Sequence, residues 1–310
     1  MSRHILVTGA CGYLGRHVAR ECAALGEVAA LDLVGDDVPA PPDVARIWRG
    51  SVLEPDLLAR ACAGVDTVVH LAAMANIYAG SPSDILRVNV LGTWHLLEAA
   101  EAAGVRRVVL CSSDSVTGLT VRPDCMKPPR YLPIDVGHPS HPTDPYGLSK
   151  KLGEEAGRCM ADRGRLEVMA LRPVYILYPR VIDEVLRRAR DPAGYAPPPD
   201  PVSPKAGGGP FWHYVAPEDA ARAFSQAVDA PMSEPFESAF VLAGETLHPT
   251  PTLERARELF GHVPEIRDSA LYAANPYAPL FDTAGANRLL GFRAPTGMRA
   301  ALLERLDAAV

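Results

Sequence analysis

The sequence predicts an α/β fold: a doubly wound parallel sheet with a smaller, interleaved C-terminal subdomain. From the start of the chain to about residue 173, short β-branched runs alternate with longer Ala- and Leu-rich segments of helical period, a pattern typical of repeated β-α-β units. With 310 residues, of which 48% are hydrophobic, the chain is long enough to bury a full core. Prolines and glycines then crowd residues 192–210, which indicates a long surface loop.

The expected strands are short and apolar, which suits strands that crossover helices bury on both faces. We expect strands at 4–8, 28–33, 67–71, 108–111 and 168–171, and helices at 14–25, 85–103 and 146–163. Two later runs, 211–215 and 240–243, also have strand character. We therefore expect a nucleotide-binding domain at 1–173 and a substrate-binding subdomain at 174–310, with parts of 211–244 returning to the first sheet.

Composition and charge exclude several classes of function. The chain has 37 acidic and 31 basic residues, a formal net charge of -6, and no Lys/Arg cluster that could follow a phosphate backbone, so nucleic acid is not an expected partner. No apolar stretch is long enough for a signal peptide or a membrane span. The six cysteines form no C-x-x-C pair. We expect a reduced, cytoplasmic protein without a structural metal.

A glycine-rich turn follows the first expected strand. Residues 8–15 read Thr-Gly-Ala-Cys-Gly-Tyr-Leu-Gly and lead directly into a helix. A dinucleotide pyrophosphate requires a tight turn at Gly9, a close approach of the backbone at Gly12, close helix-strand packing at Gly15, and a helix N-terminus that faces the anion. A glycine-rich turn without a ligand is the alternative, but the flanking strand and helix favour a Rossmann-type dinucleotide-binding domain.

Asp32 lies at the end of the second expected strand, 17 residues after Gly15. Its carboxylate can accept hydrogen bonds from a ribose 2′-hydroxyl and would repel a 2′-phosphate. The next residues, Leu33, Val34 and Gly35, offer no cation that could neutralise such a phosphate. The expected cofactor is therefore NAD rather than NADP.

A tyrosine and a lysine four residues apart form the second constellation. In the segment Tyr-Gly-Leu-Ser-Lys, Tyr146 and Lys150 lie on one face of the expected helix. The ammonium of Lys150 and an oxidised nicotinamide would lower the pKa of the phenol from about 10 towards neutrality, which makes a proton acceptor. An exposed helix start after Asp144-Pro145 is the alternative interpretation.

Hydroxyl groups follow another expected strand. The segment 111–115 reads Cys-Ser-Ser-Asp-Ser at the carboxyl end of a strand, where open α/β sheets bind their ligands. These hydroxyls could hold a substrate alcohol beside Tyr146. A serine-rich turn is the alternative.

Together these motifs resemble the extended short-chain dehydrogenase/reductase family, in its NAD-dependent epimerase/dehydratase branch. The resemblance covers nearly the whole chain, and a homodimer is the assembly it implies. It is carried by the segments 8–15, 70–73, 89–93, 112–113, 146–150, 171–173 and 282–292.

The resemblance also implies roles for individual residues. Tyr146 would be the catalytic acid/base, Lys150 would bind the nicotinamide ribose, and Ser113 would hydrogen-bond the reacting oxygen. The implied cofactor-binding residues are Gly9, Gly12, Tyr13, Leu14, Gly15, Asp32, Ser51, Val52, Leu71, Ala72, Ala73, Asn89, Ser112, Tyr146, Lys150 and Pro173. The implied substrate-binding residues are Ser113, Asp114, Ser115, Tyr146 and Tyr175.

The implied reaction is hydride transfer from a secondary carbinol carbon of a sugar or sugar-like substrate to NAD. Return of the hydride to the other face gives an epimerase, which is the leading expectation. Net oxidation of a sugar or uronate with release of NADH is the first alternative, and a non-catalytic NAD-binding regulator is the second. Elimination of water is disfavoured, because dehydratases of this branch carry an acidic pair where this chain has Asp114 and Ser115.

Departures from the family concern the substrate. Nucleotide-sugar members place an Asn and two Arg on the diphosphate, whereas this chain has Tyr175 and the cation-free segments 210–215 and 275–280. We therefore expect a smaller or uncharged substrate, held in part by loops at 118–143 and 192–210. Arg122, Arg130, Arg180, Arg187 and Arg188 could still supply charge. His138 and His141 have metal-like spacing, but a solvated loop is the preferred interpretation.

Overall fold

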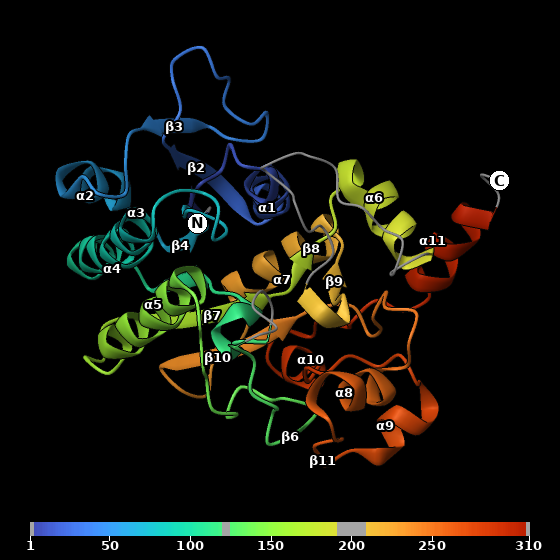
Figure 1. The fold of residues 1–310 in the computed structure, drawn as a ribbon. Helices are drawn as coiled ribbons and strands as arrows, with labels where there is room; N and C mark the ends of the chain where they lie inside the picture. Colours follow the sequence, from blue (N-terminus) through green and yellow to red (C-terminus); the bar gives the residue numbers. More distant parts are fainter. Residues whose placement is uncertain (1–2, 120–124, 191–208, 308–310) are drawn as a thin grey trace.

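A seven-stranded parallel sheet forms the centre of the computed structural model, which describes residues 3–119, 125–190 and 209–307 (Figure 1). The strand order is β10-β7-β5-β4-β1-β2-β3, in which the order from β3 to β7 is that of dinucleotide-binding sheets. The predicted fold class is therefore confirmed. The strands are β1 (Arg3–Thr8), β2 (Gly26–Asp32), β3 (Arg46–Arg49), β4 (Thr67–His70), β5 (Arg107–Cys111), β7 (Glu167–Pro173) and β10 (Phe236–Val241).

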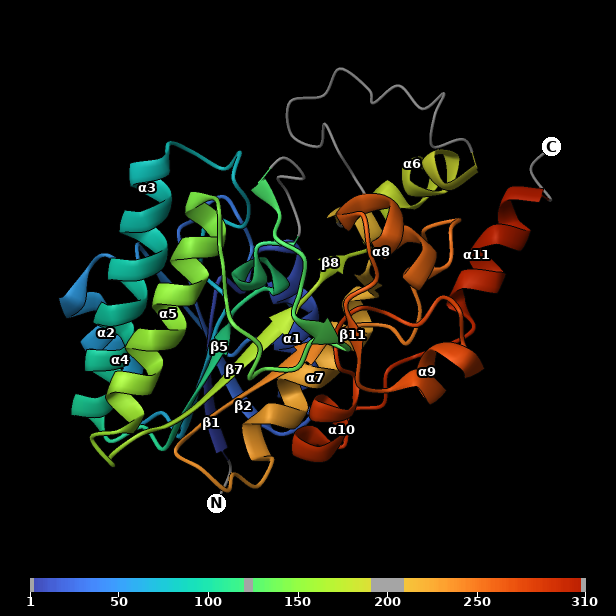
Figure 2. The same ribbon diagram turned by 60° about the horizontal axis from the view of Figure 1, so that its bottom comes forward.

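Helices cover both faces of this sheet (Figures 1 and 2). One face carries α2 (Pro55–Cys62), α4 (Gly92–Ala103) and α5 (Pro145–Ala161), and the other carries α1 (Tyr13–Ala23) and α7 (Pro217–Asp229). Successive residues of each strand point into opposite cores: in β4, Val68 packs with the first group of helices and Val69 with the second. The uniformly apolar strands of the sequence follow from this double burial.

The predicted helix at 85–103 is three segments in one. It begins with α3 (Pro82–Leu86), widens to a π-helical turn over Arg87–Leu91 and continues as α4. A π turn inside an α-helix often marks a functional position, and this one contains the buried Asn89. No sequence signal predicted the turn.

The remaining helices and two small sheets lie outside the central sheet. Leu177, Val185, Tyr214 and Leu302 belong to a third core that joins α6, β9 and α11. The helices are α6 (Pro179–Arg190), α8 (Thr252–Phe260), α9 (Ser269–Ala274), α10 (Ala284–Leu290) and α11 (Met298–Asp307). The short strand β8 (Tyr175–Ile176) pairs with β9 (Tyr214–Val215), and β6 (Tyr131–Leu132) pairs with β11 (Glu265–Ile266).

Most predicted elements of the first domain are confirmed, with ends that agree to within two residues. The predicted strand at 211–215 is wrong except for β9, because Gly209–Phe211 forms a 3-10 turn and Trp212 adopts a positive φ of 53°, which ends any extended run. The predicted strand at 240–243 begins earlier, as β10, and pairs with β7. Residues 120–124 and 191–208 of the two expected substrate loops lie outside the described residues.

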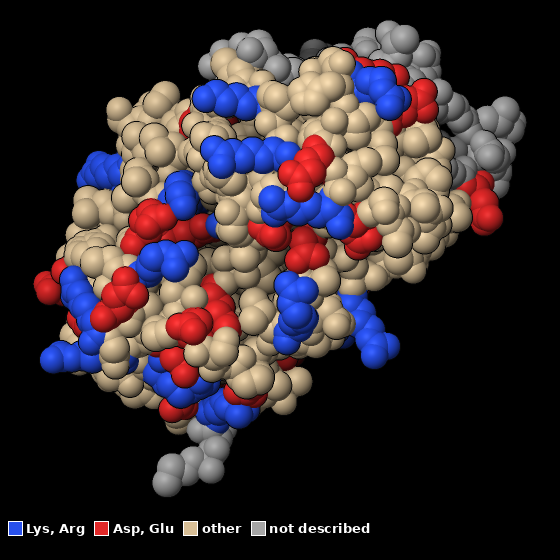
Figure 3. Space-filling view, turned by 90° about the horizontal axis from the view of Figure 1, so that it is seen from below, with Lys and Arg blue, Asp and Glu red and all other residues tan. Residues whose placement is uncertain are grey.

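Surface charge is mixed. Acidic and basic side chains alternate over the face shown in Figure 3, with no extended region of one sign. Among the described residues, no helix combines the length and the apolar character needed to cross a bilayer.

Candidate active site

The parallel sheet brings the candidate residues to one edge. All strands of the central sheet run in the same direction, so their carboxyl ends meet there. The last residues of β1, β2, β4, β5 and β7 are Thr8, Asp32, His70, Cys111 and Pro173.

The three glycines of the turn after β1 have different roles. Gly9 has a φ of 71°, and a Cβ there would lie 2.8 Å from the amide nitrogen of Ala72. A Cβ on Gly15 would collide with the carbonyl of Gly9. A Cβ on Gly12 would make one tight contact, 3.2 Å from the carbonyl oxygen of Gly9, and would meet no other part of the protein within 4 Å. The packing therefore requires Gly9 and Gly15, whereas Gly12 provides room for a ligand such as a pyrophosphate.

Asp32 is tied to this turn. Its Oδ2 accepts a hydrogen bond from the amide of Cys11 at 2.7 Å, which leaves Oδ1 for a ribose hydroxyl. The tertiary structure also brings a cation to this edge, since Arg49 of β3 lies opposite Asp32 of β2 in the strand register. Its guanidinium donates to the carbonyls of Gly35 and Val38, at 2.7 and 2.8 Å, and so stabilises the loop after Asp32.

A buried hydrogen-bond chain connects β1, β4 and α4 through His70. Thr93 donates to the carbonyl of Asn89 at 2.6 Å, so its hydroxyl accepts from Nε2 of His70 at 3.1 Å. Nδ1 of His70 then accepts from Thr8, whose Oγ1 accepts from the amide of Ala72. Burial and the charge of Lys150 lower the pKa of His70 to about 3, so the ring is neutral. The chain fixes the loop after β4 against the glycine turn.

Asn89 joins the same loop to α5. Its amide nitrogen donates to the carbonyl of Met74 and to Oγ of Ser149, and its oxygen accepts from the amide of Met74. Ser149 in turn donates to the carbonyl of Tyr146 at 2.7 Å. The side chain of Asn89 is therefore occupied by protein, which suits a positioning role rather than the expected direct contact with cofactor.

The start of α5 places Tyr146. Asp144 caps the helix by accepting from the amide of Gly147 at 2.8 Å, and a Cβ on Gly147 would lie only 2.6 Å from the carbonyl of Ser115. The helix can therefore approach η2 (Asp114–Thr117) closely. The predicted helix begins within one residue of its expected start, and Tyr146 is half-buried beside Ser113 rather than on an exposed helix start.

Tyr146, Ser113 and Lys150 form one cluster. A hydrogen bond from Ser113 lowers the pKa of Tyr146, but burial has the larger effect and holds that pKa above its usual range. Nζ of Lys150 lies 5.7 Å from the centroid of the Tyr146 ring and donates to the carbonyl of Cys111 at 2.7 Å. Burial lowers the pKa of Lys150. The expected fall of the Tyr146 pKa towards neutrality remains a prediction for the protein with NAD bound.

Asp114 and Ser115 surround Ser113. The Oγ of Ser113 lies 3.1 Å from both Oδ1 of Asp114 and Oγ of Ser115. Asp114 is only 5% exposed, and burial raises the pKa of its carboxyl to about 7. Its carboxylate form also raises the pKa of Tyr146. The site thus contains a carboxyl group that changes protonation near neutral pH.

Behind the cluster lies a buried ion pair. Arg172 donates to both oxygens of Glu154, at 2.8 and 2.7 Å, and Ser112 donates to the same carboxylate. The hydroxyl of Ser112 is thus bonded within the protein, and its amide donates to the carbonyl of Leu171 at 2.7 Å. Glu154 lies one helical turn after Lys150, and this spacing is the signal from which the sequence could have predicted its place. A cavity of about 20 Å³, wide enough for one water, separates it from His70 and Asn89.

The other expected residues lie around this edge at various distances from the cluster. Val52 is buried and packs on Gly92, Ser51 begins the turn before α2, and Tyr175 is half-buried in β8. His138 is only 9% exposed, with Nε2 accepting from the amide of Arg130, so the predicted solvated loop is wrong at this residue. Within the described residues, no group of three or more His, Cys, Asp or Glu could hold a metal ion.

The edge of the sheet thus combines a dinucleotide-binding turn with a Ser-Tyr-Lys cluster, which defines an NAD-dependent enzyme of the Rossmann class. A model of the NAD dependent epimerase/dehydratase family matches residues 5–243, and the chain belongs to that family. NAD is its cofactor, and Gly12, Asp32 and the first turn of α1 fit that cofactor.

Three known proteins illustrate the similarity. A uronate dehydrogenase of Pseudomonas syringae pv. tomato is 29% identical over 169 residues, which are 54% of this chain and 58% of the relative. An L-arabinose 1-dehydrogenase (NAD(P)(+)) of Haloferax volcanii is 32% identical over 62% of this chain and 74% of its own. A short-chain dehydrogenase/reductase superfamily protein of Agrobacterium tumefaciens, solved with bound NAD, has a TM-score of 0.69 and 26% identity over 99% of this chain and 97% of its own.

Proposed function

We propose that this protein oxidises a secondary hydroxyl of a sugar or sugar-like substrate, with Tyr146 as the acid/base and NAD as the hydride acceptor. The contact of the Tyr146 phenol with Ser113, in a cluster that includes Lys150, carries the proposal. NAD, when bound, supplies the hydride acceptor and a positive charge near the phenol. The protein's own residues then have to hold the alcohol oxygen and take its proton.

Each side chain has one task in this step. Ser113 donates a hydrogen bond to the reacting oxygen and keeps it beside the phenol. Tyr146, as phenolate, accepts the hydroxyl proton while the C–H bond breaks and the carbon becomes a carbonyl. Lys150 stabilises the phenolate, and its bond to the Cys111 carbonyl keeps the ammonium in position. The proton gained by Tyr146 is available for the reverse step.

For the fate of the ketone we propose epimerisation. The substrate turns, and the hydride returns to the other face of the carbonyl, while Tyr146 gives back its proton. The second candidate is net oxidation with release of NADH. The two dehydrogenase relatives favour it, as does the segment Pro210–Val215, which is buried and offers no cation to a nucleotide diphosphate.

The test uses purified protein with a panel of free sugars, uronates and nucleotide sugars that carry deuterium at the candidate carbon. Epimerisation predicts an inverted product that retains its deuterium, with no NADH in solution, whereas net oxidation predicts one NADH for each oxidised product. Tyr146→Phe should lower the rate by at least about 10³-fold, because the variant has no proton acceptor. Turnover of Tyr146→Phe at more than a tenth of the wild-type rate would contradict the proposal.

We further propose a homodimer formed through α4 and α5, which run side by side in Figure 2. Leu91, Leu148 and Leu152 are 43%, 40% and 39% exposed on this surface, more than leucines of a monomer require. A second copy of the chain could cover them by twofold symmetry. Light scattering should give the mass of a dimer for the wild type and of a monomer for Leu91→Arg/Leu152→Arg.

We also propose a reduced, cytoplasmic setting, because Cys22 and Cys62 pack as buried thiols in the two apolar cores of the sheet. Cell fractionation with an antibody against the protein would test it.

A further inference from the structure

Helix α6 of the C-terminal subdomain contacts the glycine-rich turn of the first domain. NH1 of Arg180 donates to the hydroxyl of Tyr13 at 3.0 Å, and Cζ of Arg180 lies 4.1 Å from the centroid of the Tyr13 ring. The ring of Tyr178 packs on Tyr13 with 5.4 Å between centroids. Three side chains thus join segments that are 167 residues apart in the chain. We call Tyr13, Tyr178 and Arg180 the clasp.

Tyr13 stands where the cofactor's pyrophosphate has to bind. It directly follows Gly12, where a Cβ would meet only the carbonyl oxygen of Gly9, and it is the first residue of α1. Amides in the first turn of a helix have no intrahelical partner and attract anions. The Tyr13 side chain is 60% exposed, so its ring projects from this helix N-terminus. Arg180 is thereby held against the side chain of the residue with which this helix begins.

The Arg180 guanidinium has donors to spare. Within the described parts of the chain, its one hydrogen bond is to Tyr13, although a guanidinium carries five N–H groups. By contrast Arg16, the other cation near the turn, donates to the carbonyl of Cys11. An arginine fork matches the oxygens of a phosphate better than any other side chain does. Arg180 therefore has both the place and the free donors for an anion on the turn.

We propose that Arg180 binds the pyrophosphate of NAD and that Tyr13 holds its guanidinium in place, so that the clasp slows the release of the cofactor. Tyr13 was expected to line the cofactor, but Arg180 belongs to a different subdomain. The two parts of the molecule therefore share the cofactor. Slow release would keep NADH on the protein while a keto intermediate forms and reacts. The proposal requires NAD at the glycine-rich turn and does not depend on which sugar reaction follows.

The experiment measures NADH release in the absence of sugar, by stopped-flow fluorescence of the full-length protein. Arg180→Gln should release NADH about tenfold faster, because a charge-assisted hydrogen bond to the pyrophosphate is lost. Tyr13→Phe, which keeps the ring but loses the hydroxyl, should release it roughly two- to threefold faster. Arg187→Gln is the matched control, an exposed arginine of the same helix, and should release NADH at the wild-type rate.

Two further measurements identify the anion. ADP-ribose, which has the pyrophosphate, should bind Arg180→Gln about tenfold more weakly than the wild type, whereas adenosine should bind both proteins equally. Raising the salt concentration should reduce the difference in ADP-ribose affinity. Arg180→Lys, which keeps the charge without the fork, should release NADH at an intermediate rate.

Unchanged NADH release from Arg180→Gln would overturn the proposal. A variant that binds NAD and ADP-ribose normally, but has a raised KM for a sugar at saturating NAD, would overturn it as well. That result would mean that Arg180 binds an anion of the substrate. A failure of the proposed sugar reaction alone leaves these binding results intact, so the two outcomes are distinguishable.

Discussion

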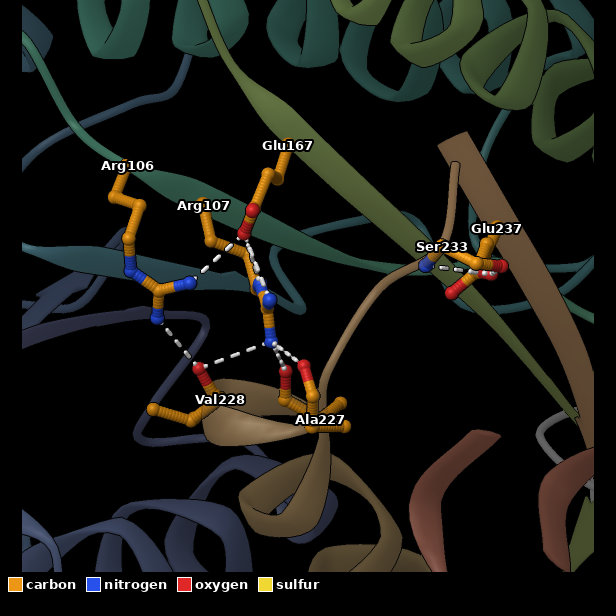
Figure 4. A network of polar contacts seen from close by, with 8 residues as sticks. Arg106, Arg107, Glu167, Ala227, Val228, Ser233 and Glu237 are labelled. Carbon is orange, nitrogen blue, oxygen red and sulfur yellow. Dashed lines mark hydrogen bonds and ion pairs between the residues drawn. The ribbon is translucent and has the colours of Figure 1, made fainter. Parts of the chain in front are cut away.

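The charged groups at the amino ends of the central strands, here called the amino edge, differ in their bonding from those at the carboxyl ends, the carboxyl edge. At the amino edge, Arg107 is 2% exposed at the start of β5, and all of its guanidinium nitrogens are bonded (Figure 4). Nε and NH2 donate to Glu167, and NH1 donates to the carbonyls of Ala227, Val228 and Ala230 at the end of α7. At the carboxyl edge, Asp114 is buried and Tyr146 is half-buried, and desolvation holds the pKa of each above its usual range.

This difference separates a structural network from a reactive one. Arg107 pairs with a carboxylate and also stabilises a helix C-terminus, where positive charge is favourable. Each nitrogen of the Arg107 guanidinium has a partner within the protein, so this network stabilises the fold. The carboxyl edge keeps groups whose burial costs folding free energy, because their proton transfer and hydrogen bonding are needed by a substrate. Substitutions at the two edges should therefore separate stability from activity.

After Tyr146→Phe, the largest effect is expected at Lys150. Lys150→Met should lower kcat by about 10²- to 10³-fold, because the Tyr146 phenolate loses its nearby cation. The acidic limb of the pH-rate profile should move to higher pH, because that loss raises the pKa of Tyr146. Lys151→Met is the matched control, since Lys151 pairs with Glu155 on the surface. Equal rates for both variants would remove Lys150 from the reaction.

At the amino edge, Arg107→Met should cost about 3 kcal/mol of unfolding free energy, because it removes a buried partner of Glu167 and leaves the carbonyls of Ala227 and Ala230 without the donor that Arg107 supplies. The kcat of the folded protein should stay unchanged. Urea denaturation measures the first quantity and an assay below the melting temperature the second. The neighbouring Arg106→Met should cost less than about 1 kcal/mol, because that side chain is 47% exposed. A loss of kcat in Arg107→Met would show that the two edges are coupled.

Removal of a buried charge should lower stability at Arg107, but it should raise stability at Asp114 when the carboxyl is ionised. Its pKa of about 7 in the folded protein lies above the value near 4 of an unfolded chain, so the carboxyl contributes stability at low pH and loses it as the pH rises through 7. Asp114→Asn should therefore be about as stable as the wild type near pH 5 and more stable near pH 8, by about 2 kcal/mol. Thermal melts at both pH values test this, with the exposed Asp43→Asn as the control.

The same variant should change the pH dependence of turnover. The Asp114 carboxylate raises the pKa of Tyr146, so its removal should move the acidic limb to lower pH. An unchanged apparent pKa of the acidic limb would mean that the charge of Asp114 does not affect the pKa of Tyr146.

The smallest effect is expected at Ser149, which connects Asn89 to the carbonyl of Tyr146. Ser149→Ala should lower kcat roughly fivefold, through a less well positioned Tyr146, and cost about 1 kcal/mol of stability. KM for NAD should change little. A variant with wild-type kcat would show that the cap at Asp144 positions the tyrosine without this link.

The sequence by itself determined the parts of this protein that depend on local pattern. Strand length, helical period and the turn at Gly9, Gly12 and Gly15 are local properties, so the sheet, the NAD site and the face shared by Tyr146 and Lys150 could be predicted. The helix start at Asp144 is likewise a local signal.

Only the tertiary structure decided which distant groups meet. The bonds of His70, Asn89 and Arg107, and the contact of Arg180 with Tyr13, join residues that are 15 to 167 positions apart, and no local pattern encodes such pairs. The pKa of Asp114 has the same origin, because the packing of the folded chain sets its burial. Local sequence motifs predict which groups can react, whereas the packing of the folded chain determines their partners and therefore their reactivity.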